Sequence, residues 1–307
     1  MASIRLVVLL VMGILFFSVI GLWAEEPKKT DEATAGKAAG EATTEKPAEE
    51  AKKDEEPKVT GAGAIGFYNR YIFRGYEIGK SGFVIQPSLT ASYRGFSAGF
   101  WANYDTNQRN TTSAVFSNEG KSGINEVDLT LSYTYTINKL SLTGGYIYYD
   151  LSYAKNTQEF FLTAALDVFG KPTISAYQDV DSYTGTYLNL SFAQSFPIYK
   201  DITIDLGASF GYLIGQGSYW KTYEPLTGDY TGPKFNDFLD GMIKVGFTIP
   251  VTKAFSISPS VQYWYPLSGD AKKTYGYNAE TGLKTPYNPN GYIKNNWVYG
   301  AGFTYSF

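Results

Sequence analysis

The chain has 307 residues, contains neither Cys nor His, and carries a formal net charge of −3. The absence of Cys excludes disulfides and thiolate chemistry, and the absence of His excludes Ser-His and His-Asp catalytic pairs. Residues 59–307 hold equal numbers of basic and acidic side chains, so their charge gives no indication of a nucleic-acid partner.

Residues 1–24 have the composition of an export signal. Arg5 precedes the apolar run LVVLLVMGILFFSVIGLW, and the small residue Ala24 follows it, directly before acidic residues. This pattern predicts a signal peptide that is cleaved after Ala24. The alternative is an uncleaved membrane anchor, because the run is long enough to reach across a bilayer core of about 30 Å.

Residues 25–58 form a spacer that is rich in Ala, Glu, Lys and Pro. The segment EEPKKTDEATAGKAAGEATTEKPAEEAKKDEEPK contains no Leu, Ile, Val, Phe, Tyr or Trp. Because it has no apolar surface to bury, we expect it to be disordered. It is either a plain spacer or a periplasmic tether.

Residues 59–307 alternate between apolar and polar side chains. In NEVDLTLSYTYT, for example, Val127, Leu129 and Leu131 share one face and Asp128 and Thr130 the other. A period of two predicts strands with one apolar face. Twelve such segments lie near 61–74, 83–93, 96–105, 125–136, 140–149, 158–168, 172–179, 185–196, 202–213, 238–249, 254–265 and 295–307.

The connections between these segments alternate in length. Short turns such as INK and FGK follow some segments, and long polar loops at 106–124, 214–237 and 266–294 follow others. With segments of about 9 to 12 residues and aromatic residues near their ends, this layout predicts an all-β fold, a transmembrane antiparallel β-barrel of twelve strands. Both termini of residues 59–307 would then face the periplasm. A soluble β-sandwich is the alternative, because alternation does not say which face is buried.

The last segment, NNWVYGAGFTYSF, ends on Phe307. It looks like the C-terminal strand of bacterial outer-membrane proteins, in which the terminal Phe is part of the signal for the barrel-assembly machinery. This resemblance implies the assembly machinery as a partner and the Gram-negative outer membrane as the location.

The region FYNRYIFRGYEIGKSGFVIQPSLTASYRGFSAGFWANY resembles the opening hairpins of the TorF-type porin family of proteobacteria. The matching residues are Phe73, Arg74, Gly75, Gly95, Phe96, Gly99, Trp101 and Asn103. The resemblance implies a barrel of about this size with a porin-like role. The rest of the chain matches in pattern only.

Alternation and strand direction place charged side chains in the lumen. Arg70 is expected near mid-depth and Arg74 at the outer end of the first strand, while Asn69 falls unexplained on the lipid-facing row with Tyr71 and Phe73. The expected lumen and constriction residues are Arg70, Arg74, Glu126, Asp128, Asp205, Asp240 and Lys244, and those of the outer mouth are Asp105, Glu159 and Asp179. The excess of carboxylates predicts weak cation preference. The alternative is a filled lumen in which these charges neutralise one another.

Together these features predict an outer-membrane porin for the passive diffusion of small hydrophilic solutes. It would contact outer-membrane lipid and lipopolysaccharide, and it would need no metal, cofactor or enzymatic activity. The alternative is a closed barrel that acts as a surface adhesin or structural anchor through its long extracellular loops. The oligomeric state is left open.

Overall fold

The computed structural model describes residues 58–78, 82–108, 120–224, 229–273 and 292–307. The predicted signal peptide lies outside these residues, as does the spacer apart from Lys58. Among the described residues, no helix is both long enough and apolar enough to cross a membrane.

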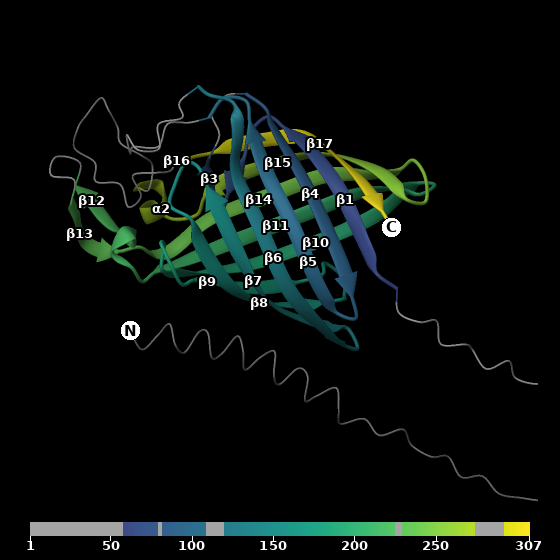
Figure 1. Cartoon of the computed structure of the whole chain (residues 1–307), viewed down its shortest axis with the longest axis horizontal. Helices are drawn as coiled ribbons and strands as arrows, with labels where there is room; N and C mark the ends of the chain where they lie inside the picture. The colour runs from purple at the N-terminus through teal and green to yellow at the C-terminus, as the bar shows by residue number, and fades with distance from the viewer. Residues whose placement is uncertain (1–57, 79–81, 109–119, 225–228, 274–291) are drawn as a thin grey trace, which may run out of the picture. The chain divides into compact units, whose positions relative to one another are not determined.

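Twelve antiparallel strands close into a barrel (Figure 1). Each strand pairs with its neighbour in chain order, and β1 pairs with β17 to close the ring. The predicted fold class is therefore confirmed. The wall strands are β1 (Thr60–Tyr68), β4 (Val84–Tyr93), β5 (Phe96–Asp105), β6 (Gly123–Ile137), β7 (Leu140–Leu151), β8 (Thr157–Leu166), β9 (Thr173–Asp179), β10 (Gly185–Tyr199), β11 (Ile202–Gly215), β14 (Asn236–Pro250), β15 (Phe255–Pro266) and β17 (Asn296–Ser306).

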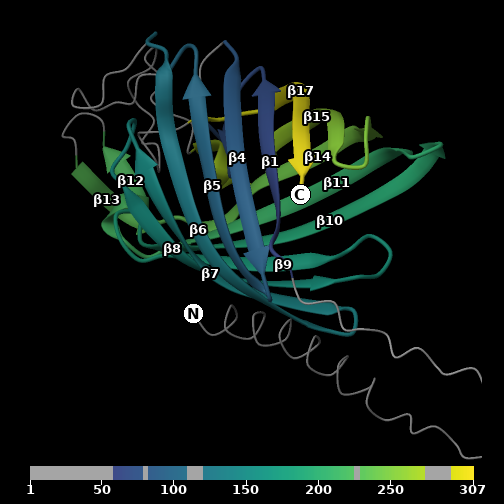
Figure 2. The same cartoon turned by 45° about the vertical axis from the view of Figure 1, so that its right-hand side comes forward.

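The two ends of the barrel differ in their connections. At one end, tight turns join the strands, and Arg94, Asn138, Lys171 and Lys200 take positive φ values of 49°, 53°, 39° and 49° there. At the other end lie the connections 69–83, 106–122, 216–235 and 267–295. We call these the short-turn end and the long-loop end. The C terminus lies at the short-turn end (Figure 2).

The smaller elements belong to the long connections. A three-stranded sheet contains β2 (Ile72–Phe73), β3 (Tyr76–Glu77) and β16 (Tyr292–Ile293), and a separate hairpin contains β12 (Lys221–Glu224) and β13 (Asp229–Lys234). The helical turns are η2 (Ser218–Trp220) and α2 (Gly269–Lys273). Figure 1 shows these elements gathered at the long-loop end.

The alternation in sequence becomes an apolar outer face. On β6, Leu129, Leu131 and Tyr133 are exposed, and the side chains between them point into the barrel. Similar exposed apolar side chains lie on the other wall strands except β9; Phe160 on β8 is 56% exposed and Trp297 on β17 is 58% exposed. Such a wide apolar surface is not stable in water, because soluble monomers rarely expose large contiguous apolar patches.

The first strand is shorter than the sequence indicated. The expected strand ran to residue 74, but β1 ends at Tyr68, and the expectation that Tyr71 and Phe73 face lipid is wrong. Ile65 and Phe67 do lie exposed on the outer face, as expected. Alternation continues past Tyr68 because the next residues form a second, smaller pair of strands, β2 and β3.

Asn69 explains how β1 can end there. Its backbone N–H donates to the Tyr299 carbonyl at 3.1 Å. Its side-chain amide then donates to the Trp297 carbonyl at 3.0 Å and accepts from the Tyr299 N–H at 2.8 Å. These side-chain bonds replace the backbone hydrogen bonds that a longer β1 would have given β17. The chain can therefore leave the wall without leaving backbone groups of β17 unpaired.

Candidate functional site

After Asn69 the chain turns into the barrel. Residues 69–78, here called the inward segment, fold back on themselves through the hairpin of β2 and β3. The hairpin turns at Arg74 and Gly75, whose φ values of 46° and 82° meet the requirement of a type I′ turn for positive φ at both central positions. Tyr71, Tyr76 and Glu77 are buried.

The inward segment crosses the lumen. It leaves from β1, and Arg74 contacts residues of β8, β9 and β10. In the order of strands around the closed barrel, β9 lies halfway round from β1. The hairpin therefore reaches the opposite wall, and the long-loop end of the lumen is narrowed by it.

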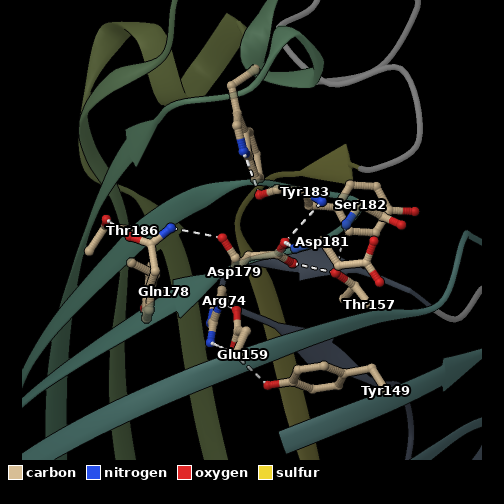
Figure 3. Close-up of polar contacts among 12 residues, drawn as sticks. Arg74, Tyr149, Thr157, Glu159, Gln178, Asp179, Asp181, Ser182, Tyr183 and Thr186 are labelled. Carbon is tan, nitrogen blue, oxygen red and sulfur yellow. Dashed lines mark hydrogen bonds and ion pairs between the residues drawn. The ribbon is translucent and has the colours of Figure 1, made fainter. Parts of the chain in front are cut away.

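Arg74 is held by one carboxylate and three aromatic rings. Its two terminal nitrogens donate to the two carboxylate oxygens of Glu159 at 2.6 and 2.7 Å (Figure 3). Its guanidinium carbon lies 4.7, 4.8 and 4.5 Å from the ring centroids of Phe73, Tyr177 and Tyr187. A bidentate ion pair combined with cation–π contacts is a strong and directional way to hold an arginine.

The hydroxyl of Tyr149 completes the surroundings of Glu159. It donates to the Oε2 atom of the carboxylate at 2.8 Å, as Figure 3 shows. Glu159 is buried. Its carboxylate thus accepts a hydrogen bond from Tyr149 on the wall side and forms an ion pair with Arg74 on the lumen side.

Glu126 is a second point of attachment for the inward segment. Its carboxylate accepts from the Tyr71 hydroxyl at 3.2 Å and from the Tyr153 hydroxyl at 2.7 Å. Burial is the largest cause, and the nearby Glu126 carboxylate the second, that raises the pKa of the Tyr153 phenol well above its ordinary value. Tyr153 therefore remains a proton donor to Glu126.

Arg70 stays close to the point where the segment leaves the wall. It donates to the Glu77 carboxylate at 2.9 Å and to the Asn296 side-chain oxygen at 2.7 Å. The Lys294 amine lies 3.5 Å from the same carboxylate. Arg70 thus stabilises the base of the hairpin, and its expected position on a wall strand is wrong.

The expected outer-mouth residues Asp105 and Asp179, and the expected constriction residue Asp240, lie near the long-loop end, each with its own donors. Asp179 accepts from the Thr157 hydroxyl at 2.6 Å and from the Asp181 and Tyr183 N–H groups at 2.9 and 3.1 Å. Asp105 accepts from the Asn107 N–H at 2.8 Å. The hydroxyl of Tyr187 donates to Asp240 at 3.1 Å. These acids are built into the wall and its loops.

Two expected constriction residues, Asp205 and Lys244, lie away from the Arg74 contacts, and a third, Asp128, lies opposite Tyr149 in the register of β6 and β7. Asp205, near the short-turn end of β11, accepts from the Thr203 and Thr248 hydroxyls at 2.9 and 2.7 Å. Lys244 lies mid-way along β14, opposite Gly207. Asp128 is half-buried, and one of its carboxylate oxygens has no hydrogen-bond partner among the described residues.

An apolar cluster packs at the long-loop end, beside the inward segment. It consists of Tyr76, Tyr187, Leu213, Trp220, Phe235, Leu239 and Ala271. Between the inward segment and the wall, a recess of about 120 Å³ is lined by Arg74, Glu126, Glu159, Tyr187 and Trp220 among others. The long-loop end thus holds a packed apolar cluster with a small adjoining cavity.

The sequence interpretation missed the aromatic partners of Arg74. Tyr177 and Tyr187 were not selected, because nothing in the alternation separates them from other tyrosines. A signal for the hairpin was present, however. The stretch FRGY at 73–76 has the same form as YRGF at 93–96, which is the tight turn between β4 and β5.

Comparisons with known proteins add distant likenesses. No protein-family model matches the chain, so its similarity to TorF-type porins stays an expectation, and no curated protein matches it. Among solved structures it is similar to the NanC porin, with 8% identity and a TM-score of 0.45 over 81% of this chain and 100% of that one. The similarity to the KdgM porin has 12% identity and a TM-score of 0.45, over 81% of this chain and 99% of that one. The similarity to an outer membrane channel from Pseudomonas putida F1 has 10% identity and a TM-score of 0.46, over 84% of this chain and 100% of that one.

Proposed function

We propose that this protein is a porin-like channel of the Gram-negative outer membrane that lets small hydrophilic solutes diffuse passively. One observation carries the proposal: the closed barrel exposes a wide band of large apolar side chains on its outer face and holds buried carboxylates and amides on its inner face. A bilayer is the solvent that such an outer face requires, and a closed barrel leaves no unpaired strand edge within it. Barrels of this kind belong to the outer membrane.

The distribution of aromatic side chains supports this orientation. Phe96, Tyr133 and Tyr199 are exposed near the short-turn end, and Trp297 and Tyr299 near the long-loop end. Aromatic residues at both rims are typical of barrels that meet two membrane interfaces. The short-turn end then faces the periplasm, where residues 25–58 also belong, and the long-loop end faces the cell exterior and its lipopolysaccharide.

The inward segment makes this a narrow channel. The proposed constriction contains Arg74 and the carboxylates Glu126, Glu159 and Asp240, with Asp128 below them. Because carboxylates outnumber cations there, we expect a weak preference for cations. Arg70, Asp105 and Asp179 act at the outer mouth in this proposal, and Asp205 and Lys244 act deeper in the lumen.

Phe307 extends the pairing of β17 with β1, which is the seam where the barrel closes. Its backbone N–H donates to the Gly61 carbonyl at 2.9 Å, and its carbonyl accepts from the Gly61 N–H at 2.9 Å. The residue is 57% exposed. An exposed terminal residue is accessible to another protein before insertion, which supports the barrel-assembly machinery as a partner.

The dense packing at the long-loop end favours a second candidate, a closed barrel that serves as a surface adhesin or anchor. Its extracellular binding residues would include 274–291, which lie outside the described residues. Recording currents from the purified protein in planar bilayers separates the two candidates. A porin gives discrete conductance steps after insertion. In a salt gradient, its reversal potential should show a preference for cations over anions. A protein that inserts, as verified by protection from protease, but carries no current is a closed barrel.

A further inference from the structure

The contacts around Arg74 come from two separate parts of the molecule. Glu159, Tyr177 and Tyr187 lie on the adjacent strands β8, β9 and β10, and we call these three side chains the wall pocket. Tyr177 and Tyr187 are directly opposite each other in the register of β9 and β10. Arg74 enters this pocket from the inward segment.

The wall itself holds the pocket in shape. The ring of Tyr177 stacks on Phe161 with a centroid distance of 5.7 Å. The hydroxyl of Tyr187 donates to Asp240, and the hydroxyl of Tyr149 donates to Glu159. None of these contacts involves the inward segment, so the wall holds part of the pocket in place without Arg74. Preorganisation of this kind lowers the entropic cost of binding.

The chemistry of the wall pocket matches one class of ligand. A buried carboxylate receives two parallel N–H donors, and the faces of Tyr177 and Tyr187 attract a delocalised cation. A guanidinium group satisfies both demands because it is planar and carries its donors in a fork. An ammonium group presents a point charge and cannot pair with both carboxylate oxygens in this way.

The recess next to Arg74 offers room for the remainder of such a ligand. Its volume of about 120 Å³ is bordered by Arg74, Glu159, Tyr187 and Trp220. A small organic cation could place its guanidinium in the wall pocket and its other atoms in this recess. The apolar faces of the recess suit a short hydrocarbon chain.

We propose that the wall pocket is a receptor for guanidinium-bearing solutes, which Arg74 occupies as an internal ligand. The receptor is a property of the wall alone. Its consequence rests on the proposed function: such solutes compete with Arg74, release the inward segment and widen the lumen for their own passage. The residue that holds the lumen narrow thereby indicates the class of substrate.

The test uses the variant Arg74→Asn in detergent micelles, with methylguanidinium as the probe in isothermal titration calorimetry. Asn followed by Gly is the preferred pair in a type I′ turn, so the hairpin is kept while the guanidinium is removed. We expect the variant to bind the probe at least about tenfold more tightly than the wild type, because the pocket loses its internal competitor. Methylammonium should bind more weakly than methylguanidinium.

Two further variants make the result specific. Arg94→Asn changes the same dipeptide in the same kind of turn at the other end of the barrel and should bind as the wild type does. Arg74→Asn combined with Glu159→Gln should lose the gain. If Arg74→Asn binds no tighter than the wild type, or if the double variant binds equally well, the receptor proposal is wrong.

Folding of each variant is checked by heat-modifiable migration on gels. If Arg74→Asn does not fold, Arg74→Gly takes its place, since glycine favours the positive φ of this position. The binding measurement is independent of conductance. Binding without current would contradict the channel and keep the receptor, and current without binding would contradict only the receptor.

Discussion

Arg74 and Glu159 join opposite sides of the barrel through a two-point ion pair with distances of 2.6 and 2.7 Å. Arg74 belongs to the hairpin that follows β1, and Glu159 belongs to β8. Removing one partner of a buried pair is costly, about 3 to 5 kcal/mol, since the other charge is left without compensation. The pair is therefore the principal attachment of the inward segment to the far wall, and the predictions below follow from it and from its neighbours.

Replacing Asn69 with Ala should destabilise the barrel at its seam. The change removes two side-chain hydrogen bonds to β17 and leaves the Trp297 carbonyl and the Tyr299 N–H without their partners. We expect a loss of about 1 to 3 kcal/mol in the free energy of unfolding, measured by urea denaturation in micelles. Asn69→Asp, which retains an acceptor for the Tyr299 N–H, should lose less. Equal losses in both variants would contradict this role of the amide.

Tyr71→Phe and Tyr153→Phe form a matched pair. Each removes one hydroxyl donor to Glu126, at 3.2 and 2.7 Å respectively. Both should cost about 1 to 2 kcal/mol of stability. Only Tyr71 lies on the inward segment, so only Tyr71→Phe should raise the frequency of open events in single-channel records. Identical gating in the two variants would show that the segment is not held through Glu126.

Gly300 marks a close approach between β17 and β1. A Cβ atom at this position would overlap the Phe67 carbonyl oxygen, which belongs to the backbone and cannot move aside. Gly300→Ala should therefore lower the unfolding free energy by about 1 to 3 kcal/mol, as overpacking does. Gly269→Ala is the control, because among the described residues no atom beyond its chain neighbours lies within 4 Å of its added Cβ. A barrel as stable as the wild type after Gly300→Ala would contradict the close approach.

Asp128 is the carboxylate through which ion preference can be tested with the least structural change. It is half-buried, and its oxygen atom without a hydrogen-bond partner among the described residues leaves its charge less compensated than that of Glu159. Asp128→Asn should lower the ratio of cation to anion permeability, measured from the reversal potential in a salt gradient. Asp205→Asn, deeper in the lumen and held by two hydroxyls, should change this ratio less. If the order of the two effects is reversed, the selective region lies near the short-turn end.

Much of the wall could be predicted from the sequence because it follows a single physical rule. Most of the twelve strands expose large apolar side chains on the outer face, and the alternate spacing of Leu129, Leu131 and Tyr133 along the chain already indicates their shared outer face. The turns also carried local signals, such as Asn138 at a position of positive φ. Local chemistry was enough for these parts.

The end of β1 could not be read from alternation. Tyr71 and Phe73 continue the pattern of Ile65 and Phe67, although the chain has already turned into the lumen. Period two describes any strand, including the short ones of a hairpin, and it does not record which sheet a strand joins. The Arg74-Gly75 dipeptide was the available clue, because positive φ at both residues ends a strand in a turn.

The partners of Arg74 depend on contacts between distant parts of the chain. Tyr177 and Tyr187 meet Arg74 only because the barrel closes and places β9 and β10 opposite β1. Such a juxtaposition is set by strand number and register together. Asn69 is a similar case, since its role depends on β17 at the far end of the chain.

Single-channel conductance of the wild type, Arg74→Asn and Arg94→Asn in planar bilayers tests the central claim most directly. If the inward segment narrows the lumen and Arg74 holds it against the wall, Arg74→Asn will give conductance steps of larger amplitude, or open states of longer duration, than the wild type. Arg94→Asn, with the same change in a turn at the short-turn end, will match the wild type. Unchanged conductance in Arg74→Asn, after verified insertion, would contradict the account.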